Sequence, residues 1–242
     1  MTEAPNPDAD TPDAHVPDNR TLDELRLDLA PLIADAAVFD GWSDAALMLA
    51  AEQAGVDPDA ARFAFKGSGG KGSGNKPDAM AMIAAWIGSI DRAMAAALPP
   101  EQVAAMPIRE RIRSMVQFRL DHMAWQKEAL RRARSEMAKP KNLAASARLG
   151  WSSADAMWHL AGDTATDYNH YTKRATLGAI YAATLMVFAD DSSEDHTETK
   201  AFLDRRIDGI MRFEKAKARF IRPKNETFSP LRVLGRLRYP AR

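Results

Sequence analysis

The stretch from Asp163 to Asp191 constrains the fold of this chain more than any other segment. Its first third is dense in charged and aromatic residues, and the run from Ala175 to Ala189 is mostly apolar and lacks proline. Such a run predicts one helix whose N-terminal part carries chemical groups and whose remainder joins a core. Because the run is shorter than the roughly 20 residues that span a bilayer, we do not interpret it as transmembrane.

Five side chains of the charged part share one face of such a helix, at about 100° per residue. They are Asp163, Asp167, His170, Tyr171 and Arg174. A bend near Thr164 would remove Asp163 and leave the other four. Two interpretations are open: a contact site for a partner, or an ion-pair network of Asp167 and Arg174 that ties neighbouring helices together. Both predict charged groups nearby, because charged side chains are seldom buried unpaired.

Composition favours an all-α fold with one sizeable core. Of the 242 residues, 46% are hydrophobic, Ala, Leu, Met and Arg dominate over Val and Ile, and no clear alternation of apolar and polar residues indicates a strand. The chain has no cysteine, which excludes disulfides and zinc-thiolate sites and fits a reducing, cytoplasmic setting. Its formal net charge is zero, so no overall charge attracts nucleic acid or a membrane.

The chain divides into five regions by composition. They are an acidic, proline-rich tail expected to be disordered (1–20), N-terminal helices resembling a helix-turn-helix (21–66), a glycine-rich linker (67–76), a helical body (77–220) and a basic tail (221–242). In the second region, Thr21 and Glu24 predict a capping box, and Asp57-Pro58 predicts the start of the third helix. That third helix offers one Arg and an apolar surface, so we expect no DNA binding.

Further helices are expected along the body. They cover 78–98, 109–125, 126–137 and 142–149, then a separate helix capped by Ser152 to Asp155 that carries Trp158 and His159, and a last long helix after Asp195. We find no metal or catalytic constellation: Asp167 and His170 form the only Asp-x-x-His pair, and no G-x-S-x-G motif occurs. We therefore expect no metal, no cofactor and no catalysis.

A succession of motifs runs from residue 158 to residue 207. The sequence reads Trp158-His-Leu-Ala-Gly162-Asp163, Asp167-Tyr-Asn-His-Tyr171-Thr-Lys-Arg174-Ala-Thr-Leu177, Tyr181-Ala-Ala-Thr184, Asp191-Ser-Ser and Phe202-Leu-Asp-Arg-Arg-Ile207. This succession resembles the hallmark of the ubiquinone-biosynthesis accessory family, the ninth of the coenzyme Q (Coq) proteins, and the resemblance covers most of residues 22–220. Tyr168 stands where Phe is usual, and His170 stands where members from mitochondria carry Trp.

The resemblance implies a TetR-like helical bundle with a degenerate helix-turn-helix, a hydrophobic cavity for isoprenoid lipid, and a patch that presents quinone intermediates to the demethoxyubiquinone hydroxylase. The predicted function is therefore that of a non-catalytic, lipid-binding accessory protein of ubiquinone biosynthesis. The alternative is a TetR-like transcription regulator that senses an apolar ligand. The expected partners are an isoprenoid lipid or quinone intermediate, the hydroxylase, a membrane surface and a second copy of the chain, but not nucleic acid.

Three sets of residues are candidate sites. The lipid set lies between the C-terminal helices, although each member could simply belong to the core: Trp125, Trp158, Leu177, Ile180, Tyr181, Leu185 and Phe188. The partner set carries over from the patch, with His170 added: Asp167, His170, Tyr171 and Arg174. The membrane set lies in a C-terminal segment, 212–242, whose formal charge is +8: Leu231, Arg232, Leu234, Arg236, Leu237 and Arg238.

A short amphipathic helix that opens at Ser229-Pro230 would bring the membrane set together. Its leucines recur every three residues, and the arginines flank them, which favours binding to an anionic surface. The alternative is a solvated basic tail, or one docked on acidic residues of the same protein. The predicted location is cytoplasmic, bacterial and peripheral to the inner membrane.

Overall fold

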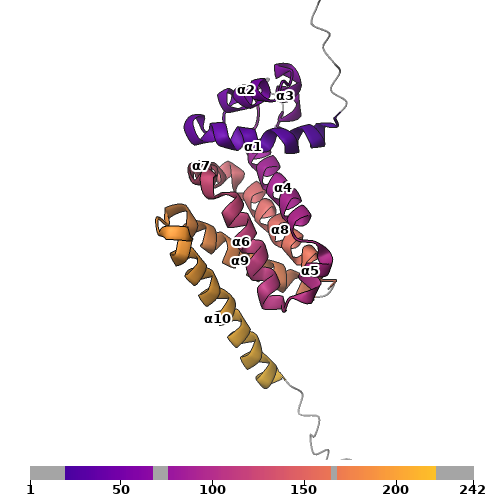
Figure 1. The fold of residues 1–242 in the computed structure, drawn as a ribbon, viewed down its shortest axis with the longest axis vertical. Helices are drawn as coiled ribbons and strands as arrows, with labels where there is room; N and C mark the ends of the chain where they lie inside the picture. The colour runs from indigo at the N-terminus through magenta and orange to yellow at the C-terminus, as the bar shows by residue number, and fades with distance from the viewer. Residues whose placement is uncertain (1–19, 68–75, 165–167, 222–242) are drawn as a thin grey trace, which may run out of the picture.

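The structure is a computed structural model that describes residues 20–67, 76–164 and 168–221, with the side chains of Tyr168 and residues 214–221 left aside. Every regular element in these ranges is a helix, which confirms the all-α class (Figure 1). One isolated antiparallel bridge, between Lys66 and Pro77, joins the two ends of the glycine-rich segment. Both predicted tails, apart from Arg20 and Ile221, and most of the linker lie outside the described residues.

The N-terminal head consists of α1 (Leu22–Asp40), α2 (Asp44–Gln53) and α3 (Pro58–Ala64). The predicted capping box is confirmed, since the Thr21 hydroxyl accepts from the Glu24 amide and the Glu24 carboxylate accepts from the Thr21 amide. The Asp57 side chain caps α3, as expected. The head therefore has the outline of a helix-turn-helix, with each start set by a local side-chain acceptor.

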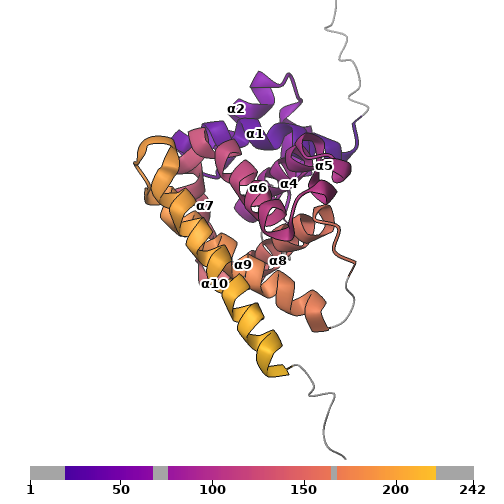
Figure 2. The same ribbon diagram turned by 60° about the horizontal axis from the view of Figure 1, so that its bottom comes forward.

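The body follows as α4 (Ala79–Ala97), α5 (Pro100–Ala105), α6 (Ile108–His122), η1 (Ala124–Gln126), α7 (Lys127–Met137), η2 (Pro140–Asn142), α8 (Leu143–Leu160), α9 (Tyr168–Asp190), η3 (Glu194–His196) and α10 (Thr197–Ile221). Helix α1 packs on α4 and α7 and so joins the head to the body. Helix α10 packs along α9 and α6, across the outside of the bundle (Figure 2).

Two tryptophans fasten the head to the body. The rings of Trp42 and Trp86 lie 5.3 Å apart. The Trp42 indole donates to the Ala129 carbonyl over 3.1 Å, and the Trp86 indole donates to the Gln126 side chain over 2.9 Å. Because both rings are buried with their N–H groups satisfied, they hold α4 and α7 against the head without an unpaired donor.

Helix α4 is, within the described ranges, the one helix long and apolar enough to cross a membrane by length and composition alone. It packs against α1, α6 and α8. Its side chains Met82, Ile83 and Ile90 are fully buried. Its apolar character therefore contributes to the core of the bundle.

The predicted break between residues 149 and 152 is wrong, because α8 runs without interruption from Leu143 to Leu160. Gly150 suggested a helix end, yet it lies inside α8 where α9 crosses closely: a Cβ on Gly178 would lie 3.8 Å from the Gly150 carbonyl oxygen. Tertiary packing thus outweighs the low helix propensity of glycine. The chain turns instead at Gly162, whose φ of +82° favours glycine.

Candidate functional site

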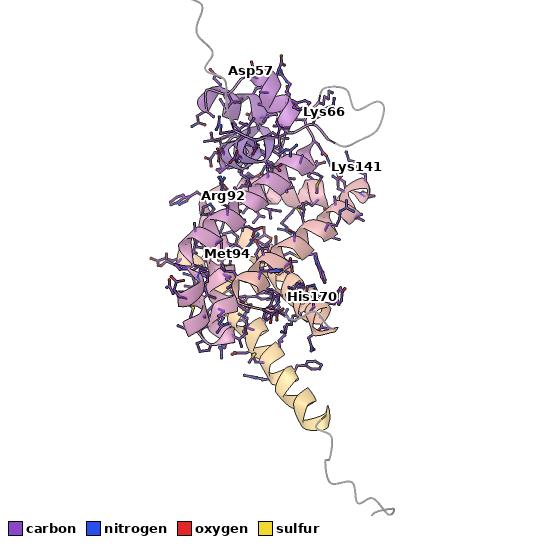
Figure 3. The ribbon with its side chains drawn as sticks, turned by 90° about the vertical axis from the view of Figure 1, so that its right-hand side faces the viewer. Asp57, Lys66, Arg92, Met94, Lys141 and His170 are labelled. Carbon is purple, nitrogen blue, oxygen red and sulfur yellow. The ribbon has the colours of Figure 1, made fainter. Side chains whose placement is uncertain are left out.

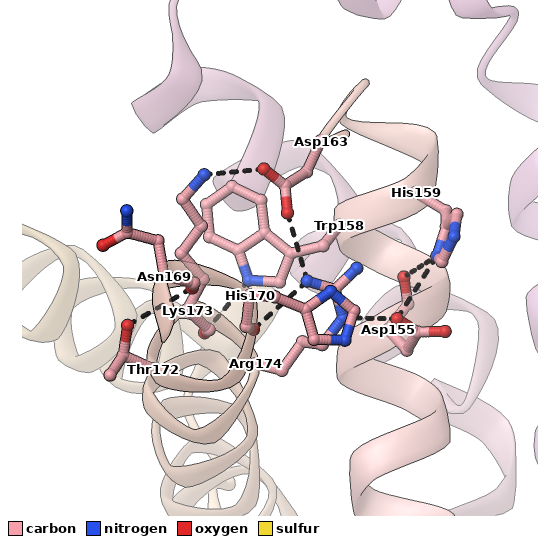
Figure 4. A network of polar contacts seen from close by, with 9 residues as sticks. All are labelled: Asp155, Trp158, His159, Asp163, Asn169, His170, Thr172, Lys173 and Arg174. Atoms are coloured by element: carbon pink, nitrogen blue, oxygen red, sulfur yellow. Dashed lines mark hydrogen bonds and ion pairs between the residues drawn. The ribbon is translucent and has the colours of Figure 1, made fainter. Parts of the chain in front are cut away.

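Arg174 is the centre of a charged cluster between α8 and α9, although it is only 1% exposed (Figure 4). Its guanidinium forms ion pairs with Asp155 of α8 and with Asp163, the latter at 3.1 Å. It also donates to the His170 carbonyl over 3.2 Å. Burial lowers the pKa of Arg174, but the hydrogen bonds that it donates to Asp155 and Asp163 outweigh this effect, and the pKa is raised above its ordinary value. Arg174 is therefore a charged crosslink between the helices.

Asp163 completes this crosslink from outside the helices. The side chain is 6% exposed, and it also pairs with Lys173 over 2.6 Å. The Trp158 indole donates to the Lys173 carbonyl over 3.0 Å. Since α9 begins at Tyr168, Asp163 does not belong to the helix predicted for 163–191. This matches the case in which Asp163 leaves the helical face, and Asp163 instead pairs with Arg174 from outside the helix.

Three aromatic residues, which we call the aromatic surface, lie outside this cluster: Trp151, His170 and Tyr171. The Trp151 ring lies 6.3 Å from His170 and 6.1 Å from Tyr171, and the last two rings are 5.1 Å apart. Tyr171 is 61% exposed. Trp151 was not singled out from the sequence; a continuous helix from 143 to 160 would have placed it seven residues before Trp158, on the same face.

The predicted partner set separates in the structure. His170 and Tyr171 lie on the aromatic surface, whereas Asp167 lies outside the described residues. The prediction that Arg174 contacts a partner directly is corrected, because its side chain is buried. Its guanidinium donates to Asp155, Asp163 and the His170 carbonyl. The ion-pair interpretation therefore holds for Arg174.

A cavity of about 700 Å³ lies between α4, α6, α7, α8 and α9. Two members of the predicted lipid set, Tyr181 and Leu185, line it. Apolar side chains from the other helices form much of the remaining wall: Ile83, Trp86, Ile87, Ile90, Met123, Leu130, Met137 and Leu149. Arg131 and Asp190, whose side chains are also exposed to solvent, line it too and form an ion pair over 3.7 Å. The wall of this large cavity is therefore mostly apolar and includes a few charged residues.

Arg119 adds one polar cluster to the wall of the large cavity, and it is 1% exposed. It pairs with Asp91, and it donates to the Tyr181 hydroxyl over 2.9 Å and the Ser153 hydroxyl over 3.1 Å. Burial raises the pKa of Asp91, although Arg119 opposes the shift. The sequence contained one signal for this cluster, because Arg119 falls inside the apolar stripe of its helix.

A second, small cavity of about 260 Å³ lies between α6, α8, α9 and α10. Three other members of the predicted lipid set line it: Trp158, Leu177 and Ile180. Isoleucines of α6 and α10 complete the apolar wall, and Arg109 and Lys173 are its charged residues. Five of the seven residues of the predicted lipid set therefore line one or other of two cavities that share α9.

Two residues of the predicted lipid set line neither cavity. Phe188 is fully buried, and its ring lies 5.0 Å from the ring of His196. Trp125 lies in η1 with 94% of its surface exposed. Both assignments are corrected, since the first side chain is packing in the core and the second points away from it. The predicted membrane set lies outside the described residues.

The head lies far from the aromatic surface, as the labels of Asp57 and His170 show in Figure 3. In α3, Arg62 pairs with Asp44 over 3.0 Å and with Asp59 over 3.5 Å. Its charge is thus neutralised by neighbouring carboxylates. In the parts of the chain that the structure describes, no three His, Asp or Glu side chains form a group that could hold a metal.

The C-terminal part of the chain is similar to known proteins. Residues 143–214, which span α8, α9 and most of α10, match the COQ9 family model. The ubiquinone biosynthesis protein COQ9 of Rattus norvegicus is 43% identical over 100 residues, which are 41% of this chain and 32% of that protein. The Homo sapiens protein is 42% identical over the same share of this chain and 31% of its own length. The chain thus aligns with about a third of these mitochondrial relatives, and the predicted resemblance is confirmed.

A solved structure is similar over more of the chain. The TetR transcriptional regulator from Nitrosomonas europaea superimposes with a TM-score of 0.54 at 18% identity, covering 76% of this chain and 95% of that one. At this identity the likeness concerns the fold alone. It confirms the TetR-like helical bundle.

Proposed function

We propose that this protein acts in ubiquinone biosynthesis as a non-catalytic accessory protein, which binds an isoprenoid lipid or quinone intermediate and presents it to the demethoxyubiquinone hydroxylase. The large cavity is the single observation that carries this proposal. Its volume of about 700 Å³ falls within the range of roughly 300–1,000 Å³ typical of ligand pockets, and its apolar wall suits a polyprenyl chain. The match of residues 143–214 to the COQ9 family adds independent support.

The aromatic surface is the proposed contact for the hydroxylase. Exposed aromatic side chains are enriched at the centres of protein interfaces, where they bury a large area at low entropic cost. Position 170 holds His where mitochondrial members of the family carry Trp. Trp151 of α8 supplies a large aromatic ring beside His170. The charged cluster under this surface fixes α8 against α9 and so sets the spacing of the three rings.

Membrane binding is proposed for the basic tail on its sequence alone. Each Lys or Arg near an anionic surface adds about 1 kcal/mol of attraction. Deleting residues 229–242 should therefore reduce sedimentation with anionic liposomes at low salt and change binding to neutral liposomes little. Equal sedimentation of the full and shortened chains would remove the tail from the mechanism.

The proposed lipid binding is tested by mass spectrometry of lipids extracted from the purified full chain. Replacing Leu185 with Trp fills part of the large cavity, so the amount of co-purified polyprenyl lipid should fall several-fold. Leu49→Trp is the matched control, because Leu49 is exposed on α2 and lines neither cavity. Equal lipid in wild type and Leu185→Trp would contradict the assignment.

The alternative of a transcription regulator requires a basic surface on the head. The ion pairs of Arg62 with Asp44 and Asp59 weigh against it, since paired cations attract phosphates poorly. Salt-dependent binding of duplex DNA by the purified protein would revive this alternative.

A further inference from the structure

Arg109, a residue that lines the small cavity, has a buried donor without an acceptor. Within the described residues, the Nε of Arg109 is the one buried side-chain nitrogen or oxygen without a hydrogen-bond partner. The same guanidinium is anchored elsewhere, because its Nη2 pairs with Asp208 of α10 over 2.7 Å. A buried unpaired N–H is costly, and such groups usually find a protein, water or ligand acceptor. Because Arg109 lines the small cavity, an occupant that reaches its guanidinium would supply the missing acceptor.

The wall of the small cavity indicates what else the occupant must offer. Trp158 supplies an aromatic surface, and Ile112, Ile180 and Ile207 supply aliphatic ones. The volume is about 260 Å³, whereas an engineered cavity of about 150 Å³ binds benzene. A substituted ring therefore fits, and a long polyprenyl chain does not.

Charge balance indicates a neutral acceptor. The two cations on the wall are each paired with a carboxylate, Arg109 with Asp208 and Lys173 with Asp163. A carboxylate or phosphate would gain little net attraction here and would lose its hydration. A carbonyl or phenol oxygen carries a much smaller desolvation penalty and still accepts from a charged donor.

The small cavity also lies next to both parts of the proposed mechanism. Along α9, Leu177 and Ile180 line the small cavity while Gly178 and Tyr181 line the large one. Asn169 and Thr172, which flank the aromatic residues His170 and Tyr171, line the small cavity too. A ring held there would lie beside the surface proposed to contact the hydroxylase.

We infer that the small cavity is the site for the head-group ring of a quinone intermediate, with one ring oxygen accepting a hydrogen bond from the Nε of Arg109. The inference rests on the proposed function and adds to it a second site with different chemistry. The large cavity binds the apolar polyprenyl chain, and the small cavity selects a ring that bears a carbonyl or hydroxyl group. Arg109 is then a specificity-determining residue for the ring.

The test uses a ubiquinone analogue with one isoprene unit, titrated into the full chain and followed by quenching of tryptophan fluorescence. Arg109→Lys keeps a positive charge for Asp208 but lacks the Nε donor, so binding should weaken about ten- to a hundredfold, as expected for a lost hydrogen bond to a charged group. Trp158→Phe should remove most of the quenching, because Trp158 lines this cavity.

Arg113→Lys is the matched control. Arg113 lies one turn further along α6 and pairs with Asp204, one turn earlier on α10, but it lines neither cavity. Unchanged binding in this variant is expected. Equal weakening in both variants would assign the effect to the docking of α10 and overturn the inference, as would equal affinity of Arg109→Lys and wild type.

A polyprenol without a ring separates this inference from the proposed function. If polyprenol binds and the short quinone analogue does not, the ring site is wrong and lipid binding stands. If neither binds, the proposed function itself fails. Binding of the analogue that is sensitive to Arg109→Lys and insensitive to Leu185→Trp supports two distinct sites.

Discussion

Arg174 and Arg119 are both 1% exposed, yet they lie in very different surroundings. Arg174 has two carboxylates and a backbone carbonyl around it, and it lines neither of the two cavities described above. Arg119 has one carboxylate and two hydroxyls, and it lines the large cavity. This difference in surroundings indicates that a buried arginine can have two structural roles. A buried arginine that is surrounded by acceptors holds helices together. A buried arginine that lines a cavity also places a polar group in an otherwise apolar wall.

The largest expected effect is the loss of Arg174. Arg174→Met removes the buried cation that pairs with the nearly buried Asp163, although Lys173 still pairs with that carboxylate, so the free energy of unfolding should fall by about 3 kcal/mol, at the lower end of the cost of breaking a buried pair. Urea unfolding followed by circular dichroism measures it. Arg113→Met, which breaks a more exposed pair, should cost at most about 1 kcal/mol. Similar losses of unfolding free energy in Arg174→Met and Arg113→Met would contradict the role of Arg174 as a buried crosslink.

A smaller effect is expected for Arg119. Asp91 is partly exposed and its pKa is already raised, so it can take up a proton when Arg119→Met removes its partner. We expect a loss of about 2 kcal/mol in urea unfolding. The double variant Arg119→Met with Asp91→Asn should recover part of the loss, because neither charge then remains. A double variant as unstable as the sum of the two single changes would show that the two residues act independently.

The pH dependence of Asp91 sharpens the same contrast. Burial raises the pKa of this carboxyl in the folded protein, so above about pH 4 the folded state binds its proton more readily than the unfolded state. The stability that Asp91 contributes is thus complete at low pH and is lost as pH rises through the folded pKa. In urea titrations from pH 3.5 to 6.5, wild type should lose stability relative to Asp91→Asn. Asp59→Asn, at an exposed carboxylate, is the control variant. A gain in the stability of wild type relative to Asp91→Asn as the pH rises would contradict the predicted sign.

The smallest effect on stability is expected on the aromatic surface. Trp151→Ala should change the free energy of unfolding by less than about 1 kcal/mol, since the side chain is partly exposed. If the surface contacts the hydroxylase, the same change should weaken co-purification about tenfold or more. Trp125→Ala removes an equally large ring at 94% exposure and should leave co-purification unchanged. Equal retention of the hydroxylase by both variants would remove Trp151 from the interface.

Local signals were sufficient to predict the helices whose starts depend on nearby side chains. Thr21 and Asp57 cap helices where expected, because their acceptors act within three residues. The break at Gly150 failed, since whether a glycine ends a helix or admits a neighbouring one depends on α9, which lies elsewhere in the sequence. An ion-pair network at Arg174 was one of the two predicted interpretations, but it named Asp167, which lies outside the described residues. Asp155, the partner on α8, lies 19 residues before Arg174 and was not predicted.

The partners of Arg119 could not be predicted from the sequence, although its own place in an apolar stripe was a signal. Asp91, Arg119, Ser153 and Tyr181 come from four different helices. Nothing in their spacing relates them, and only the packing of α4, α6, α8 and α9 brings them together. The division of the lipid set between two cavities has the same cause. Periodicity identifies which side chains of α9 are apolar, but it does not tell which neighbouring helix each of them faces.

The most direct test of the central claim, that the large cavity holds the lipid, is photo-crosslinking with a polyprenyl lipid that carries a diazirine in its chain. After irradiation of the full chain, peptide mass spectrometry locates the label. The account predicts labelling of α8 and α9 near Leu149, Tyr181 and Leu185, and its loss in Leu185→Trp. Labelling that falls on the head, or that persists on the same peptides in Leu185→Trp, would contradict it.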